Sequence, residues 1–173
     1  MAKMFLICGI SGVGKTTLSQ RMAEKHELRR IGVDDFYAKV NGDDKDRRNK
    51  FEVWIEFFKA IHEAEVNDVD CVVEASGLTK YQRREFVEWF PEFEHHLIFI
   101  EATADLRNKN NLARNRQVPD WRIAEMEKKV QRPDAEDCEC FDSVTFFCNK
   151  NNVFSTPHVM CGKWNFENKN YNN

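Results

Sequence analysis

Three groups of side chains along this chain are suited to the chemistry of phosphate. The first is the glycine-rich stretch 9–16, GISGVGKT, which follows the apolar run Met4–Cys8. The second is the acidic pair Asp34-Asp35, and the third is a run rich in arginine and asparagine at 107–116. Phosphoryl transfer between oxygens needs groups that bind phosphate, a base for the attacking hydroxyl and cations that neutralise developing charge. All three requirements have candidates here.

The stretch 9–16 matches the pattern GxxxxGK[S/T] in full. Its glycines allow a tight turn whose backbone N–H groups point at phosphate oxygens, beside the positive end of the following helix. The lysine of this pattern reaches the β- and γ-phosphates, and the hydroxyl after it holds Mg²⁺. We therefore expect ATP and Mg²⁺ here, with the metal on Thr16. The residues predicted to bind the nucleotide are Gly9, Ser11, Gly12, Val13, Gly14, Lys15, Thr16 and Thr17.

Such a loop serves kinases, switch GTPases and motor ATPases. A switch GTPase is expected to carry the guanine-reading sequence N-K-x-D, but both Asn-Lys stretches, 108–111 and 149–152, read NKNN. Motor ATPases usually need a further oligomerisation domain, for which 173 residues leave no room. A kinase needs only the loop, a base beside the acceptor hydroxyl and a cationic lid. The sequence therefore favours a kinase.

Carboxylates follow two predicted strands that end on the same side of the sheet. Asp34 and Asp35 end the second strand, and Glu74 ends the third. Ligands of open α/β sheets bind at the carboxyl ends of the strands. One aspartate is therefore a candidate general base, and Glu74 is a candidate to order Mg²⁺ through water or to hold the acceptor. The alternatives are a turn or helix cap for the aspartates and a solvated strand end for Glu74.

Arginines are the candidates for a lid and for the acceptor site. Arg107, Arg114 and Arg116 lie between two predicted helices, where a lid would close over the phosphates. Arginine binds phosphate in a bidentate manner, although such runs are more often a solvated face. Arg83 and Arg84, on the helix after the third strand, could contact an anionic acceptor or be plain surface charge. We predict Arg114 and Arg116 on the donor phosphates.

The elements that must position these residues follow an alternating pattern. Apolar runs predict strands at 4–8, 28–34, 70–76, 96–102 and 142–148, and helices are expected at 15–26, 48–66, 79–90, 105–115 and 120–130. Such alternation implies a parallel sheet with helices on both faces. We predict a three-layer α/β/α P-loop NTPase fold with a five-stranded parallel sheet and a helical lid. In the helix at 48–66, the spacing of Phe51, Trp54, Phe58 and Ile61 predicts one buried stripe.

Length and composition limit the class of protein to which this chain can belong. A chain of 173 residues with 42% apolar and 32% charged residues suits one globular domain. We place the kinase domain at 1–150, with its lid at about 105–132, and expect 151–173 to be a partly disordered tail. The six cysteines indicate neither a disulfide framework nor a zinc site, and no run is long enough to span a membrane. These features favour a cytoplasmic protein without an evident protein partner.

Taken in order, the motifs resemble the kinase domain of the bacteriophage polynucleotide 5′-hydroxyl kinases and related small P-loop kinases. The resemblance spans residues 3–147 and rests on five stretches: GISGVGKTT, VDDFY, CVVEASGLTKYQRR, NLARNRQVPDWRIAEMEKKV and FDSV. It implies that Lys15 and Thr16 contact phosphate and metal. It also implies that Asp34 is the general base and that Arg114 is the lid arginine. The implied acceptor is the 5′-hydroxyl of a polynucleotide or nucleotide.

The chain departs from this family mainly on the acceptor side. The family often has an arginine two residues after the acidic pair, where this chain has Tyr37 and Ala38. The third strand ends in Glu74 rather than aspartate, and no phosphatase motif of the DxDGT type follows. Two alternatives therefore stay open. One is a kinase of a small hydroxylated metabolite, and the other is a nucleotide-binding regulatory protein without transferase activity.

Overall fold

The computed structural model describes residues 1–43, 46–114, 117–155, 157–163 and 171. In chain order the elements are β1 (Lys3–Cys8), α1 (Lys15–His26), β2 (Arg29–Gly32), α2 (Val33–Asn41), α3 (Lys50–Val66), β3 (Cys71–Glu74), α4 (Lys80–Trp89), β4 (Glu94–Ala102), α5 (Ala104–Leu112), α6 (Asp120–Lys129), α7 (Ala135–Cys140), β5 (Ser143–Lys150), β6 (Val153–Phe154) and β7 (His158–Cys161). Within these ranges, no helix combines the length and the apolar character needed to cross a membrane.

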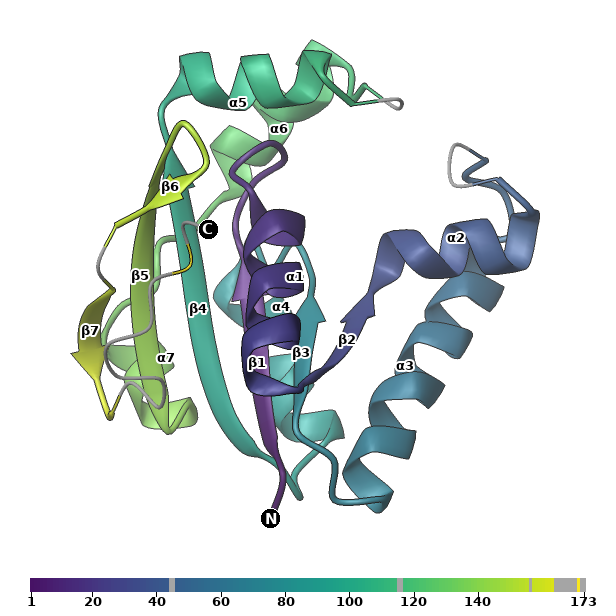
Figure 1. Ribbon diagram of the computed structural model, residues 1–173, viewed down its shortest axis with the longest axis vertical. Coiled ribbons are helices and arrows are strands. Elements are labelled where there is room, and N and C mark those ends of the chain that lie inside the picture. The colour runs from purple at the N-terminus through teal and green to yellow at the C-terminus, as the bar shows by residue number, and fades with distance from the viewer. Residues whose placement is uncertain (44–45, 115–116, 156, 164–170, 172–173) are drawn as a thin grey trace.

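The predicted five-stranded parallel sheet is confirmed. Its strands run in the order β2-β3-β1-β4-β5, all parallel, and β6 and β7 add antiparallel pairs to the outer edge of β5. In this order β1 is central: Leu6 is level with Val73 of β3 on one side and with Leu97 of β4 on the other. The carboxyl ends of β1, β2 and β3 therefore lie side by side at one edge of the sheet (Figure 1).

Both faces of the sheet are covered, which gives three layers. Along β1 the side chains alternate: Met4 and Leu6 belong to one buried cluster, and Phe5 and Ile7 belong to another. The first cluster includes residues of α3 and α4, and the second includes residues of α1. Side chains that alternate between two faces of the sheet and are apolar on both are typical of a parallel strand buried on both sides.

The buried stripe of α3 differs from the prediction. Its buried residues are Val53, Phe57, Ala60, Ile61 and Ala64. Of the predicted stripe only Ile61 is fully buried, because the helix is rotated by about one residue relative to that expectation. Phe51 is 81% exposed, and Trp54 and Phe58 are only partly buried. Apolar residues surround this helix, so their periodicity alone did not decide which face meets the sheet.

The acidic pair lies in a helix rather than at the end of a strand. β2 ends at Gly32, whose backbone is still extended, and Val33 begins α2. Asp34 and Asp35 therefore occupy the first turn of α2, where negative charge is stabilised by the helix dipole. This is a small correction, because the first turn of α2 still lies at the carboxyl edge of the sheet.

The C-terminal part contributes to the sheet and the core. β6 and β7 fall within the stretch 151–173 that the sequence indicated as a tail, and each pairs with β5. Tyr171 is 2% exposed, and its hydroxyl lies 2.8 Å from Nε2 of His26 on α1. The predicted boundary at residue 150 therefore separates β5 from strands that hydrogen-bond to it.

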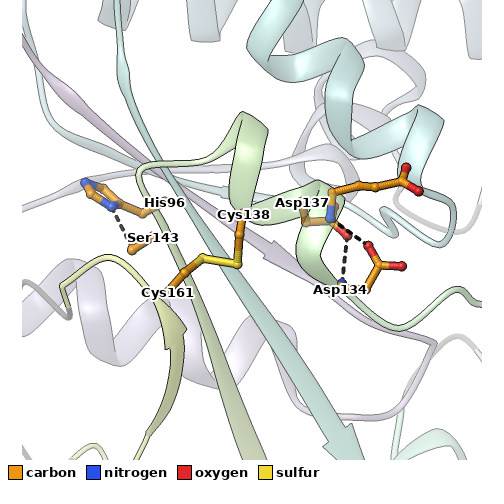
Figure 2. Close-up of a disulfide and its surroundings, with 7 residues drawn as sticks. His96, Asp134, Asp137, Cys138, Ser143 and Cys161 are labelled. Atoms are coloured by element: carbon orange, nitrogen blue, oxygen red, sulfur yellow. Dashed lines mark hydrogen bonds between the residues drawn. A yellow bond between two sulfur atoms is a disulfide. The ribbon is translucent and has the colours of Figure 1, made fainter.

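A disulfide that the cysteine spacing did not indicate joins α7 to β7. Cys138 and Cys161 form it, 23 residues apart (Figure 2). The short helix α7 was also not predicted; it begins with a capping box between Asp134 and Asp137. Disulfides are rare in reducing compartments. The cytoplasmic location, which rested partly on the cysteine pattern, stays a prediction.

Candidate active site

The phosphate loop joins β1 to α1 and depends on two glycines with left-handed backbones. Gly12 has φ 85° and Gly14 has φ 101°. A Cβ added at Gly12 would lie 2.6 Å from the Arg107 carbonyl oxygen, and one at Gly14 would lie 2.5 Å from Nδ2 of Asn149. Any side chain at either position would be strained and would also collide with its neighbour.

Two asparagines from distant elements hold this loop in place. Nδ2 of Asn110, on α5, donates to the Gly12 carbonyl at 2.7 Å. Nδ2 of Asn149, on β5, donates to the Val13 carbonyl at 2.8 Å. The loop is thus anchored to the base of the lid on one side and to β5 on the other. Sequence reasoning missed both contacts.

Lys15 is partly buried and donates to carbonyls of the loop. Its Nζ donates to the carbonyls of Gly9 at 2.8 Å and Ile10 at 2.9 Å. Burial lowers the pKa of Lys15 to about 8; the negative charge of Glu74 opposes this shift, and the positive charge of Arg114 adds to it. A partly buried cation held by neutral carbonyls is well placed to exchange them for anionic phosphate oxygens, which interact with it more strongly.

Thr16 and Glu74, the two residues predicted to bind the metal, are in direct contact. Thr16 Oγ1 donates to Glu74 Oε2 at 2.8 Å, and Ser19 Oγ donates to Glu74 Oε1. Glu74 is 8% exposed, although it ends β3. A hydroxyl and a carboxylate supply the hard oxygen ligands that Mg²⁺ prefers, usually with waters and substrate phosphates completing its shell. No cluster of three His, Cys, Asp or Glu side chains that could hold a metal occurs in the described ranges.

Arg30, which sequence reasoning missed, bridges two acidic side chains. Its Nε donates to Glu74 Oε1 at 2.7 Å and its Nη1 donates to Asp35 Oδ2 at 2.7 Å. The only hint in the sequence was a pair of arginines within the short strand β2. Arg30 thereby fixes one oxygen of Glu74 and leaves the other toward Thr16.

The two aspartates of α2 have different surroundings. Asp35 pairs with Arg30 and does not line the cleft, whereas Asp34 lines it and accepts from Arg47 Nη2 at 2.8 Å. Arg47 follows α2 in the loop before α3, and no feature of the sequence singled it out. Of the two aspartates, Asp34 has the better access to a substrate.

The lid arginines divide into one that faces the loop and one that supports the lid. Arg114 Nη1 lies 3.4 Å from Ser11 Oγ of the phosphate loop, and Arg114 lines the cleft. Arg107 instead donates to the Ala102 carbonyl at 2.7 Å and pairs with Glu127 of α6. Arg116, predicted on the donor phosphates, lies outside the described residues.

The structure does not bring Arg83 and Arg84 to the site. Arg83 is 0% exposed, and its Nε and Nη2 donate to both carboxylate oxygens of Asp137 at 2.8 and 2.7 Å. Its Nη1 donates to the carbonyls of Gly77 and Gln131. Arg84 pairs with Glu136 on the surface at 3.0 Å. The predicted acceptor contact is therefore corrected for Arg83, because its donors are already used inside the protein.

One cleft of about 780 Å³ brings together six of the fifteen residues predicted for the site. Its lining includes the side chains predicted for phosphate, metal, base and lid, namely Ser11, Lys15, Thr16, Asp34, Glu74 and Arg114. It lies between α2 and α3 on one side and the lid helix α6 on the other, with β3 and α4 behind it. These chemically different groups, far apart in the chain, share one cavity.

The model of the AAA domain family matches residues 4–133, which include the phosphate loop and the predicted lid. This chain belongs to that family. A search of the curated proteins finds no match to the sequence.

Solved structures with the same fold include several small kinases. A gluconokinase from Sinorhizobium meliloti 1021 superposes with a TM-score of 0.58 at 17% identity, covering 84% of this chain and 82% of the other. A sugar kinase from Janibacter sp. HTCC2649 gives 0.60 at 18% identity, covering 86% of each chain. A chain of the PezAT chromosomal toxin-antitoxin system of Streptococcus pneumoniae gives 0.67 at 13% identity, covering 91% of this chain and 72% of that one. At such identities the likeness shows a shared fold alone.

Proposed function

We propose that this protein is an ATP- and Mg²⁺-dependent kinase that phosphorylates a hydroxyl group of a small molecule. The observation that carries the proposal is that Lys15, Thr16, Asp34, Glu74 and Arg114 line one cleft. A phosphate loop alone would be compatible with any nucleotide-binding protein. A carboxylate and a lid arginine in the same cavity are what a phosphoryl transfer additionally needs.

In the proposed reaction, Asp34 accepts the proton of the acceptor hydroxyl as its oxygen attacks the γ-phosphorus. The bond to the oxygen that bridges the β- and γ-phosphates breaks, and ADP leaves. Lys15 and Arg114 stabilise the charge on the transferring group, since positioning and electrostatics supply most of the catalysis in such reactions. Mg²⁺, when bound at Thr16 with Glu74 ordering its waters, would neutralise the β- and γ-oxygens.

Two acceptor classes are supported by different observations. The gluconokinase and the sugar kinase with this fold act, by their names, on small molecules, and a cleft of about 780 Å³ suits such an acceptor. The motifs around Asp34 and Arg114 instead resemble those of polynucleotide 5′-hydroxyl kinases. We favour the small molecule and keep the polynucleotide end as the second candidate.

A transfer assay separates these candidates. The protein is incubated with γ-labelled ATP, Mg²⁺ and a panel of sugars, nucleosides, nucleotides and 5′-hydroxyl oligonucleotides. Label on a small hydroxyl compound supports the proposal, whereas label only on oligonucleotides would replace it with the second candidate. Nucleotide binding without label on any acceptor would identify a regulatory protein and overturn the kinase.

A further inference from the structure

The two carboxylate oxygens of Glu74 have different surroundings. Three donors converge on Oε1: Nε of Arg30 at 2.7 Å, Nη2 of Arg30 at 2.6 Å and the hydroxyl of Ser19, which is 0% exposed. The other oxygen, Oε2, accepts from the Thr16 hydroxyl at 2.8 Å. Glu74 therefore has one oxygen held by donors of the protein and one that faces the hydroxyl on which the proposed function places the metal.

Arg30 is fixed by contacts on more than one side of its guanidinium. Its Nη1 donates at 2.7 Å to Oδ2 of Asp35, in the first turn of α2, and its Nε also donates to Ser19 Oγ at 3.0 Å. Only 21% of the Arg30 side chain is exposed. The guanidinium is a rigid planar fork, so with Asp35 on one branch and Glu74 on the other it has little freedom to release Oε1.

Gly32, the last residue of β2, leaves room for this bridge. Its backbone is extended, with φ −118°, so no left-handed turn requires glycine here. A Cβ at this position would instead lie 3.0 Å from Nη2 of Arg30, 3.2 Å from Oδ2 of Asp35 and 3.4 Å from Oε1 of Glu74. Glycine in a strand often marks such a close approach. We call Arg30, Ser19 and Asp35 together the Glu74 clamp.

The freedom of a carboxylate affects which divalent cation it suits. Ca²⁺ accepts more oxygen ligands than Mg²⁺ and often takes both oxygens of one carboxylate, whereas Mg²⁺ demands a near-octahedral shell and keeps several waters. Glutamate also has one more rotatable bond than aspartate, so an unrestrained Glu74 could turn both oxygens toward a cation. The Glu74 clamp opposes this, because the donors of Arg30 and Ser19 already occupy Oε1.

We propose that Arg30 is a positioning residue that sets the cation preference of the donor end. By holding Oε1, it leaves Glu74 a single oxygen to present, and this favours Mg²⁺ over Ca²⁺. Arg30 acts through Glu74 rather than on the cation itself. This inference rests on the proposed function, in which Thr16 and Glu74 hold the metal beside ATP, and it adds the residue that decides which divalent cation is held there.

Nucleotide affinity, which does not depend on phosphoryl transfer, tests this role. The dissociation constant of a non-hydrolysable ATP analogue is measured by calorimetry with saturating Mg²⁺, with saturating Ca²⁺ and in EDTA as a reference. The wild type should bind the Mg²⁺ complex more tightly than the Ca²⁺ complex. In Arg30→Gln the ratio of the two constants should shift toward Ca²⁺ by about tenfold or more, the usual effect of losing a residue that orients a metal ligand. The lost positive charge acts on both dications alike, so the ratio reports the freedom of Glu74.

A second variant and a matched control accompany Arg30→Gln. Ser19→Ala removes one donor to Oε1 without changing any charge, so it should shift the ratio in the same direction by a smaller factor, and it tests the Glu74 clamp even if Arg30→Gln does not fold. Arg29, the neighbour on β2, pairs with Glu63 and does not line the cleft, so Arg29→Gln should keep the wild-type ratio. A wild type without preference between the cations, or an unchanged ratio in Arg30→Gln and Ser19→Ala, would overturn the inference. A shifted ratio without transfer to any acceptor would support it even though the kinase proposal had failed.

Discussion

The two ends of the cleft are built in different ways. At the donor end, one continuous stretch of eight residues, 9–16, supplies the loop, the lysine and the hydroxyl, and backbone groups do much of the work. At the acceptor end, single side chains from β2, α2, the loop before α3, α3 and the lid come together. The donor end is therefore specified by residues that are neighbours in the chain, whereas the acceptor end forms only when the helices pack together.

The difference appears in how arginines are used. Arg114 and Arg47 line the cleft, whereas Arg83 is buried in the interior, where it connects α4 to α7 and to Gln131, just after α6. In the sequence they look alike. Their roles follow from burial and from the side chain that each one contacts: Ser11 for Arg114, Asp34 for Arg47 and Asp137 for Arg83.

The largest expected effect concerns the base at the acceptor end. Asp34→Asn should lower kcat about 10²- to 10⁴-fold, the range for loss of a general base, while the affinity for ATP stays nearly unchanged because the donor end is intact. Steady-state kinetics and nucleotide titration measure the two quantities. Asp35→Asn is the matched control with a smaller expected effect, since Asp35 faces Arg30. Full activity of Asp34→Asn would show that another group is the base.

The buried arginine should matter for stability rather than for substrates. Asp137→Asn leaves Arg83 buried and only partly compensated, and breaking such a pair costs about 3–5 kcal/mol of unfolding free energy. Glu136→Gln breaks only the pairs of Glu136 with Arg84 and Lys80, which are partly exposed, and should cost less than about 1 kcal/mol. Denaturant unfolding compares the two. Equal losses would contradict the assignment of Arg83 to the structure.

The disulfide should stabilise the edge of the sheet farthest from β2. Cys138→Ser removes the only bond of this kind among the described residues, between α7 and β7. The free energy of unfolding should fall by about 2–4 kcal/mol under non-reducing conditions. Under reducing conditions, the wild type should match the variant. A variant as stable as the oxidised wild type would show that packing alone holds β7 in place.

The smallest effect is a pH dependence of the donor end. Lys15 has a pKa lowered to about 8 in the free protein, and phosphate oxygens favour its protonated form. Binding of ATP above pH 8 therefore takes up a proton, so the affinity should be constant from about pH 7 to 8. It should then fall by up to about tenfold per pH unit at higher pH. Titrations with ATP in the presence of EDTA isolate the contact between Lys15 and the phosphates. The variant Lys15→Ala should bind ATP weakly, and its affinity should not fall in this way at higher pH. A wild-type affinity for ATP that stays constant up to pH 9.5 would contradict the coupling between ATP binding and the protonation of Lys15.

Most of the fold could be predicted from the sequence. The alternating apolar runs gave the five parallel strands, and the helix expected at 79–90 corresponds to α4, Lys80–Trp89. The errors concern orientation and short elements. The aromatic residues of α3 surround the helix, so the pattern could not decide its buried face, and α7 is too short to leave a periodic signal.

The sequence by itself determined the donor end, because the conformation of the loop depends on glycines and a lysine that are neighbours in the chain. It also placed Asp34 and Glu74 near that end, since parallel strands finish at one edge. Only the tertiary structure decided that Arg30 holds Glu74, that Arg47 meets Asp34 and that Arg83 is buried. Those contacts join residues from separate elements, and their energies depend on burial and distance, which no local pattern encodes.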